Sequence, residues 1–466
     1  MAPYDYIAQR DNDDERLNFL YRISDERDEI VSFVAERVGW AGAAEFDRYS
    51  RGSFNFNLHI RHTTTGERVL IRFPIPGRVR REWRDEKVAN EVMTINYLRH
   101  HTSIPIPKVR CWGLTEESPQ QLGPFIIMDF AEGKDLSDLL QQPTEDEQEE
   151  IVLDPNIDEA KLDIVYDQIA GFMLELARLE FPRLGAISKD AASGEWSAAK
   201  RPLTYDMNEV VTLGGVTANY FAATGPFDSS RDYFTFRAKT FEEHLEAQRN
   251  IAGDDEYLMW KHYVARRGFE ALIPTYCDAA DTEPFRLFCD DLRPTNMLAD
   301  LETLRIIAVI DFEFTNAMPS QFVYDPPWWL LLKPPSSWIS DDETQEFLDH
   351  FVPRMEQFLQ AMERAEQRLE SSSTEGGQRT SRNIAARMRD SWISGRFWFN
   401  YASRSSFDIE EIYWTMLPQN DLNEKESTGA VLDDFVQRKM LQFKKYKTQR
   451  ENDERSSEDC HRFDQT

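Results

Sequence analysis

The stretch "FCDDLRPTNMLAD", residues 288–300, concentrates three acids, an arginine and an asparagine between two short apolar segments. The runs "FRLFC" at 285–289 and "RIIAVIDFEF" at 305–314 flank it and are typical of short β-strands. Asp291 and Asn296 are five residues apart, so they can flank a tight loop and face one cavity. The stretch therefore predicts a polar loop between strands, inside a half of the chain whose other patterns are helical.

Asp311 ends the apolar run "IIAVI", residues 306–310, which predicts a buried strand with its acid at the strand end. Three oxygen-bearing side chains, from Asp291, Asn296 and Asp311, are then expected to converge where the strands end. Magnesium uses oxygen ligands, usually one or two protein carboxylates together with substrate phosphates. The pattern therefore predicts a site for magnesium and phosphate.

These residues resemble the catalytic signature of the aminoglycoside phosphotransferase and choline-kinase-like family, which belongs to the protein-kinase-like superfamily. The shared pattern is D-x-x-x-x-N, an apolar strand, I-D-[FW]-E, and a later D-P segment, here "YDPPWWLL" at 324–331. The resemblance covers roughly residues 45–335. It implies an α+β fold with two lobes, a small antiparallel-sheet N-lobe and a larger, mainly helical C-lobe.

The resemblance also implies the roles of the three residues. Asp291 is expected to orient and deprotonate the acceptor hydroxyl, and Asn296 and Asp311 to hold the Mg²⁺ ions that bridge the phosphates of ATP. The family's loop usually has the sequence H-G-D-L-H-P-G-N, and Cys289 stands at its histidine position. For Cys289 a packing role is favoured over a nucleophilic one.

The upstream half can be compared with the same family. Gly52 and Ser53, in "RGSFNFNLHI" at 51–60, occupy the place of the phosphate-covering hairpin loop, although the segment has a single glycine. Arg72 stands where many relatives have a lysine that contacts the α and β phosphates. Arginine keeps the charge but presents a planar fork, so the pairing geometry differs.

Two further segments complete the expected nucleotide site. Glu91 lies on the inward side of a predicted helix at 82–99, where it can pair with Arg72; a functional pair and two surface charges remain equal alternatives. The backbone near Met128 and Phe130, in "FIIMDFAEG", corresponds to the hinge that contacts the adenine edge.

The polarity and size of the chain predict its organisation and location. We expect an N-terminal helical extension at 1–44, the N-lobe at 45–133, the C-lobe at 134–441 and a disordered tail at 442–466. The formal charge of −29 repels nucleic acid phosphates and anionic membrane surfaces. Four dispersed cysteines and the lack of a long apolar segment favour a cytoplasmic protein without a membrane partner.

Several neighbouring residues have structural alternatives. Asp290 is interpreted as an exposed loop acid, and Arg293 as a salt-bridge partner within the loop at least as readily as a substrate contact. Glu313 has two equal alternatives: it contacts and supports the metal-binding residues, or it is a solvated acid at the end of the strand. Asp325 is expected to cap or turn a segment. The aromatic run at 392–401 is expected to be helix core.

The favoured function is transfer of the γ-phosphoryl group of ATP to a hydroxyl of a small molecule. The main alternative is a weak or inactive kinase-like protein that binds a nucleotide or a partner, since Cys289, Arg72 and the glycine-poor loop depart from the family pattern. A protein kinase is disfavoured because the chain has neither an H-R-D nor an A-P-E-like segment. A purely structural helical protein leaves the acidic loop unexplained.

Overall fold

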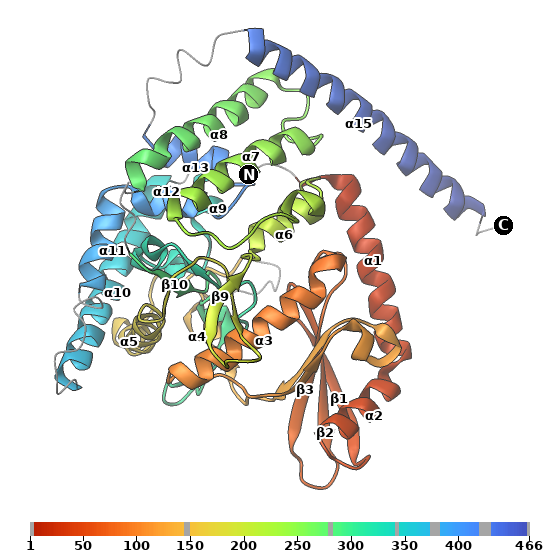
Figure 1. The fold of residues 1–466 in the computed structure, drawn as a ribbon, viewed down its shortest axis with the longest axis vertical. Helices are drawn as coiled ribbons and strands as arrows, with labels where there is room; N and C mark the ends of the chain where they lie inside the picture. The colour runs from red at the N-terminus through yellow and green to blue at the C-terminus, as the bar shows by residue number, and fades with distance from the viewer. Residues whose placement is uncertain are drawn as a thin grey trace.

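A five-stranded antiparallel sheet forms the first lobe of the computed structural model (Figure 1). The spatial order of its strands is β1-β2-β3-β5-β4. Because successive side chains of a strand point to opposite faces, β5 contributes Phe125 and Ile127 to one core and Ile126 and Met128 to another. The strands are β1 (Ala44–Arg51), β2 (Asn55–His62), β3 (Arg68–Pro74), β4 (Val109–Gly113) and β5 (Phe125–Asp129).

Helices cover both faces of this sheet. On one face α1 (Tyr6–Asp25) and α2 (Arg27–Arg37) pack Phe19 and Ile30 against the strands. On the other face α3 (Arg84–His101) contributes Val88 and Val92 to a core that continues into the second lobe. Helix α3 therefore borders the helical lobe.

The structure describes residues 4–143, 150–277, 283–340, 344–372, 383–418 and 430–463. Within these ranges the second lobe is mainly helical, and one large apolar core joins most of its helices. Its helices are α4 (Leu136–Leu140), α5 (Glu159–Leu176), α6 (Tyr205–Thr212), α7 (Ser230–Ala247), α8 (Glu256–Tyr276), α9 (Pro335–Ser340), α10 (Thr344–Ser372), α11 (Ile384–Ile393), α12 (Arg396–Ala402), α13 (Ile409–Met416) and α15 (Ala430–Phe463). The predicted α+β fold class, a small antiparallel sheet followed by a mainly helical region, is confirmed.

Short strands in the second lobe carry the polar loop that the sequence singles out. As predicted, strand β10 (Phe285–Phe288) precedes the loop and β12 (Ile306–Val309) follows it; β11 (Met297–Ala299) lies between them and pairs with β12 in a hairpin. The three small sheets have the orders β13-β10-β7, β12-β11-β6 and β8-β9. The remaining strands are β6 (Lys134–Asp135), β7 (Glu180–Phe181), β8 (Ala186–Lys189), β9 (Trp196–Lys200) and β13 (Asn316–Met318).

Helix α1 links the two lobes on the side where α6 lies (Figure 1). Its second half is anchored to the sheet by Phe19 and Ile23. Near its first turn, Asn12 Nδ2 donates to the carbonyl of Thr212 in α6 over 2.8 Å, and the amide of Asp5 donates to the carbonyl of Leu213 over 2.9 Å. Helix α1 therefore contacts both the sheet and the helical lobe.

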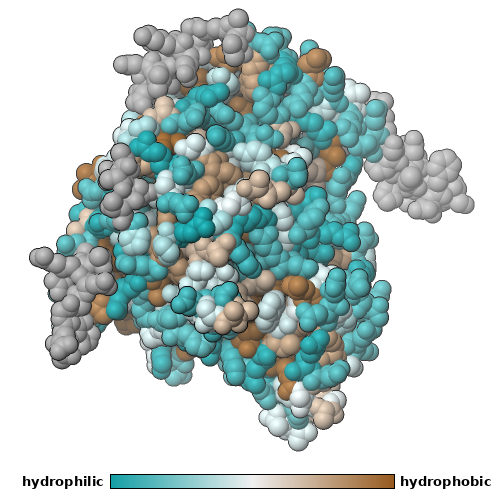
Figure 2. All heavy atoms as spheres, in the orientation of Figure 1, coloured by the Kyte–Doolittle hydropathy of each residue, from teal (hydrophilic) through white to brown (hydrophobic). Residues whose placement is uncertain are grey.

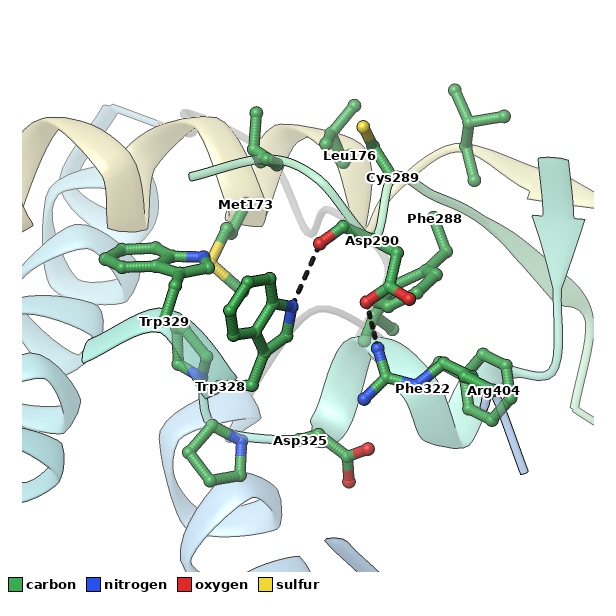
Figure 3. Close-up of a pocket in the computed structure, with 15 residues that line it drawn as sticks. Met173, Leu176, Phe288, Cys289, Asp290, Phe322, Asp325, Trp328, Trp329 and Arg404 are labelled. Atoms are coloured by element: carbon green, nitrogen blue, oxygen red, sulfur yellow. Dashed lines mark hydrogen bonds and ion pairs between the residues drawn. The ribbon is translucent and has the colours of Figure 1, made fainter. Parts of the chain in front are cut away.

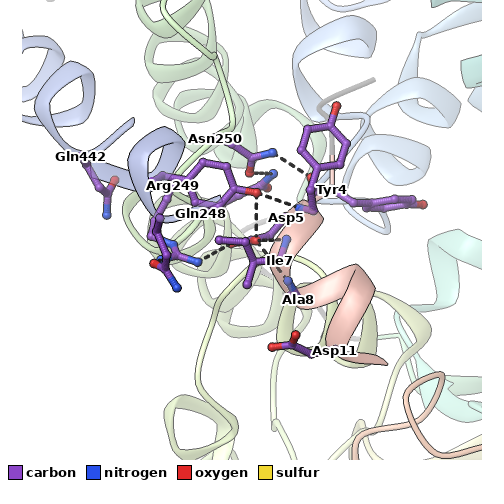
Figure 4. Close-up of polar contacts among 12 residues, drawn as sticks. Tyr4, Asp5, Ile7, Ala8, Asp11, Gln248, Arg249, Asn250 and Gln442 are labelled. Atoms are coloured by element: carbon purple, nitrogen blue, oxygen red, sulfur yellow. Dashed lines mark hydrogen bonds and ion pairs between the residues drawn. The ribbon is translucent and has the colours of Figure 1, made fainter. Parts of the chain in front are cut away.

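Asp5 holds the N-terminal end of α1 in place through several polar contacts (Figure 4). Its carboxylate accepts hydrogen bonds from the amides of Ile7 and Ala8 at 3.0 and 3.2 Å, which caps α1. It also lies 3.3 Å from the guanidinium of Arg249 and accepts a 3.2 Å hydrogen bond from Tyr446 of α15. One buried side chain thus joins three segments that are far apart in the sequence.

Helix α15 differs from the disordered tail that the sequence predicts for 442–466, because it continues to Phe463; residues 464–466 lie outside the described residues. Leu432, Phe435 and Met440, in its first part, are buried in an apolar cluster of the helical lobe. Within the range of the predicted tail, Tyr446 is buried and donates to Asp5.

Asp5→Ala is expected to lower the free energy of unfolding by about 2 kcal/mol, because it removes a helix cap and leaves Arg249 without its carboxylate. Urea unfolding measures the change. Asp11→Ala is the matched control, since Asp11 lies on the same helix, is exposed and pairs with its neighbour Arg10. Equal stability of the Asp5 and Asp11 variants would contradict the anchoring role.

No described helix has both the length and the apolar character needed to cross a bilayer. The face of the molecule in Figure 2 is mostly hydrophilic, with small hydrophobic patches scattered over it.

Candidate active site

The loop after β10 holds Asp291 and Asn296 together. The amide nitrogen of Asn296 donates to Asp291 twice, to the carboxylate oxygen Oδ2 at 2.7 Å and to the main-chain carbonyl at 2.9 Å. Pro294 begins the 3₁₀ turn Pro294–Asn296 that brings the asparagine back toward the aspartate. Because the nitrogen is used in this way, the oxygen Oδ1 is the atom that Asn296 can offer to a metal ion.

Asp311 lies next to this loop through the pairing of β11 with β12. Met297 faces Val309 in the hairpin, and the amide of Ile310 donates to the carbonyl of Asn296 over 2.9 Å. Asp311 has a φ of 69°, a left-handed conformation that a non-glycine residue adopts at a cost, so the surrounding structure must hold it there. Asp291 and Asn296 are in direct contact, and Asp311 lies close enough to Asp291 to raise its pKa.

Arg72 joins the sheet to this site. Its guanidinium lies 2.8 Å from Glu91 in α3 and 2.7 Å from Asp311, so one cation connects the two lobes. Its side chain is only 9% exposed and that of Glu91 only 1%, which excludes two ordinary surface charges. Of the two alternatives for this pair, the structure shows the buried ion pair.

Three residues of this site were not among the predicted nucleotide-binding residues. Lys87 of α3 forms an ion pair with Glu313, and its ammonium lies 3.2 Å from the side-chain oxygen of Asn55 in β2. Asn55 in turn donates to Glu313 over 2.8 Å. Glu313 is buried, so the alternative of a solvated strand-end acid is wrong. The signal available in the sequence was the spacing of four residues between Lys87 and Glu91, which places both on one helix face.

The other predicted nucleotide-binding residues lie in the first lobe, in the turn between β1 and β2 and at the end of β5. Gly52 and Ser53 form the turn between β1 and β2, where the amide of Gly52 donates to the carbonyl of Asn55 over 2.9 Å. Met128 lies inside the sheet, paired with both neighbouring strands. Phe130 begins the connection from β5 to β6.

The electrostatics of the loop suit a proton acceptor. Burial raises the pKa of Asp291 to about 6 and the nearby Asp311 adds to the rise, while Arg293, whose guanidinium lies 2.5 Å from Asp291, and Asn296 lower it. At neutral pH Asp291 is therefore mainly a carboxylate. Burial raises the pKa of the Cys289 thiol far above neutrality, so Cys289 is a packing residue and no thiolate nucleophile.

Asp290, in the loop after β10, contacts residues of the helical lobe (Figure 3). The indole nitrogen of Trp328 donates to the carbonyl of Asp290 over 3.1 Å, and the Asp290 carboxylate forms an ion pair with Arg404. Asp290 is exposed, as predicted for a loop acid, and its carboxylate is paired with Arg404. These residues border a small cavity of about 50 Å³ that also reaches Asp325 and Cys289.

Asp325 accepts hydrogen bonds from two of the C-terminal helices. Ser391 donates to it over 2.5 Å and Asn400 over 3.0 Å, so it joins the segment after β13 to α11 and α12. Burial raises the pKa of Asp325 to about 7. The predicted aromatic run at 392–401 packs around it as core, with Phe397 and Phe399 buried.

The raised pKa of Asp325 predicts a pH-dependent stability. Between about pH 4 and pH 7 the folded chain holds a proton that the unfolded chain releases. The contribution of Asp325 to the free energy of unfolding therefore falls as the pH rises over this range, and it is lost above about pH 7. Relative to Asp325→Asn, the wild type should lose about 2 kcal/mol of unfolding free energy between pH 5 and pH 7.5. Urea unfolding of both proteins at the two pH values measures this. Parallel pH profiles would contradict it.

The donor set fits magnesium. Asp311 and Asn296 offer one carboxylate and one amide oxygen at adjacent strand ends, and a magnesium ion takes its other ligands from phosphates and water. The described residues contain no group of three or more His, Cys, Asp or Glu side chains arranged around a metal position.

Comparisons with known proteins agree with this chemistry. The model of the phosphotransferase enzyme family matches residues 48–367, more than half of the chain. The chain is 23% identical over 295 residues to "altered inheritance of mitochondria protein 9, mitochondrial" of Debaryomyces hansenii, a match that covers 55% of this chain and 45% of that protein.

Two solved structures are also similar. Ethanolamine kinase of Plasmodium vivax has 12% identity and a TM-score of 0.38, with 87% of this chain and 83% of that chain covered. Choline kinase of Cryptosporidium parvum has 11% identity and a TM-score of 0.39, with 90% and 95% covered. Both TM-scores are below 0.5, so the family assignment rests on the family model.

Proposed function

Because the chain belongs to the phosphotransferase enzyme family of the protein-kinase-like superfamily, we propose that it transfers the γ-phosphoryl group of ATP to a hydroxyl group of a small molecule. The observation that carries this proposal is the meeting of Asp291, Asn296 and Asp311 at adjacent strand ends. The ion pair of Arg72 and Glu91 beside them supports it, since a phosphate site needs a fixed cation.

In the proposed reaction Asp291 orients the acceptor hydroxyl and takes its proton. The hydroxyl oxygen forms a bond to the γ-phosphorus while the bond between that phosphorus and the β-bridging oxygen breaks, and ADP leaves with the electron pair. Asn296 fixes one carboxylate oxygen of Asp291 and Arg293 lies at the other, so the base has a defined direction. A positioned base of this kind contributes about 10²- to 10⁴-fold to the rate.

The remaining side chains position charge. Asn296 and Asp311 would hold Mg²⁺, which supplies neutralisation of the phosphate charge when bound. Arg72 lies on β3, the central strand of the sheet, and is held there by Glu91; its guanidinium can turn from Asp311 to the α and β phosphates. The connection after Phe130 would face the adenine. A cytoplasmic location stays part of the proposal, with cell fractionation as its test.

A weak or inactive nucleotide-binding protein is the second candidate, and one contact favours it. Arg72 lies 2.7 Å from Asp311, so in this structure the proposed metal ligand is occupied by a cation. The two candidates differ in whether binding of Mg²⁺ and ATP separates this pair and is followed by transfer.

Incubation with ATP, Mg²⁺ and a library of small hydroxyl compounds tests the proposal, with mass spectrometry to detect acceptors that gain one phosphate. We expect at least one acceptor to be phosphorylated and ADP to form in equal amount. Binding of ATP without any phosphorylated acceptor and without ADP formation would favour the inactive candidate.

A further inference from the structure

Lys87 is a buried cation that the proposed reaction does not use. Its side chain is 0% exposed, and it contacts Glu313 directly. Its ammonium also lies 3.2 Å from Asn55 Oδ1 and 3.7 Å from Glu91 Oε2. The ring of Phe314 lies 5.7 Å from it. Burial removes the hydration of the lysine ammonium, which costs free energy. The charged form is stable here only if its attraction to the surrounding acids offsets that cost.

The charges around Lys87 are shared between two cations. Arg72 contacts Glu91, Asp311 and Glu313, the last at 3.5 Å, and Lys87 contacts Glu91 and Glu313. Glu91 Oε2 has no hydrogen-bond partner, and the cation paired with this oxygen is the Lys87 ammonium, 3.7 Å away. Three carboxylates therefore depend on two cations.

Nucleotide binding would break this arrangement, on the premise of the proposed function. Arg72 has to turn toward phosphate, and Asp311 has to accept Mg²⁺ in place of the guanidinium. Glu91 and Glu313 cannot leave, because both are buried. With Arg72 turned away from Asp311 and Glu313, Lys87 is the cation of this network that remains in contact with Glu313.

We propose that Lys87 is a positioning residue that neutralises Glu313 and so frees Arg72 for the nucleotide phosphates. It acts through Arg72 and makes no contact with phosphate itself. Without Lys87, the uncompensated carboxylate of Glu313 holds the guanidinium inside the acid network. The nucleotide then has to compete with a buried anion for the same cation.

Lys87→Met is expected to raise the Kd for Mg²⁺ and AMPPNP by about 10- to 100-fold in isothermal titration calorimetry, since breaking a buried ion pair has effects of at least this size. Lys439→Met is the matched control. Lys439 is also buried, and its ammonium contacts the main-chain carbonyls of Glu246 and Gln248 at 3.1 and 2.9 Å, away from the site. That variant should lose stability and keep the wild-type Kd.

A second substitution separates this role from a purely structural one. In Lys87→Met/Glu313→Gln the carboxylate that would hold Arg72 is gone, so the Kd should return to within about threefold of that of Glu313→Gln alone. If Lys87→Met does not fold, this comparison of the double variant with Glu313→Gln carries the test. A nucleotide Kd that is still more than about tenfold weaker in the double variant would overturn the inference, as would an unchanged Kd in folded Lys87→Met.

The wild type distinguishes the two levels of the proposal. Wild-type binding of Mg²⁺ and AMPPNP together with wild-type affinity in Lys87→Met would refute the positioning role alone. A wild type that does not bind the nucleotide at all would refute the proposed function and, with it, the role of Lys87.

Discussion

Asp291→Asn is expected to lower the rate of phosphoryl transfer by about 10²- to 10⁴-fold while nucleotide binding is kept. Asparagine has nearly the same shape as aspartate and can still contact Arg293 and Asn296, but it cannot take a proton from the acceptor hydroxyl. Asp291 is placed to face the acceptor rather than the metal, so the Kd for Mg²⁺ and AMPPNP should change by less than about threefold.

Turnover of the best acceptor found in the library measures the first effect, and calorimetry measures the second. Glu302→Gln is the matched control, because Glu302 is an exposed acid in the turn between β11 and β12. If Asp291→Asn retained more than a tenth of wild-type turnover, Asp291 would not be the base.

Asp311→Ala is expected to abolish the stabilisation of the protein by Mg²⁺ and ATP. A ligand present at 100 times its Kd stabilises the folded state by about 2.7 kcal/mol, which is visible as a rise of the melting temperature. Alanine removes the carboxylate of the metal site, so the magnesium–nucleotide complex loses the anchor that joins it to the C-lobe. The variant also releases Arg72 from one of its carboxylates.

Thermal melts with and without Mg²⁺ and ATP test this for the wild type, for Asp311→Ala and for Asp228→Ala. Asp228 is an exposed acid that pairs with Arg183 and is outside the site. The wild type and Asp228→Ala should show equal upward shifts, and Asp311→Ala none. An equal shift in all three proteins would exclude Asp311 as a metal ligand.

The three residues at the centre of the site could be predicted from the sequence because they lie in two short segments joined by a hairpin. The spacing of Asp291 and Asn296 is a property of one loop, and the apolar run before Asp311 is a strand that must pair nearby. Such local patterns determine which side chains meet before the rest of the chain is known.

The network across the lobes could only partly be predicted. Arg72 and Asp311 are 239 residues apart, and Asn55 and Glu313 are 258 residues apart. No local period relates such positions, so the sequence left Glu91 and Glu313 between functional and surface roles. Their burial, which only the assembled lobes determine, decides both cases.

The contacts between the two ends of the chain were the least predictable part of the fold. In α1, apolar anchors are sparse among acids and bases, because much of its length spans the distance between the lobes instead of lying on a core. The polar later half of α15 has the composition of a disordered tail, although Tyr446 donates to Asp5. Both helices depend on partners from the opposite end of the chain.

The central claim is that Asp291, Asn296 and Asp311 form one site for a metal-bound nucleotide. A crystal structure of the wild type with Mg²⁺ and AMPPNP tests it most directly. We predict magnesium bound to oxygens of Asn296 and Asp311, Arg72 turned from Asp311 to the phosphates, and the Asp291 carboxylate facing the γ-phosphate across an open acceptor position. A nucleotide bound elsewhere, or magnesium without contact to Asp311, would contradict the claim.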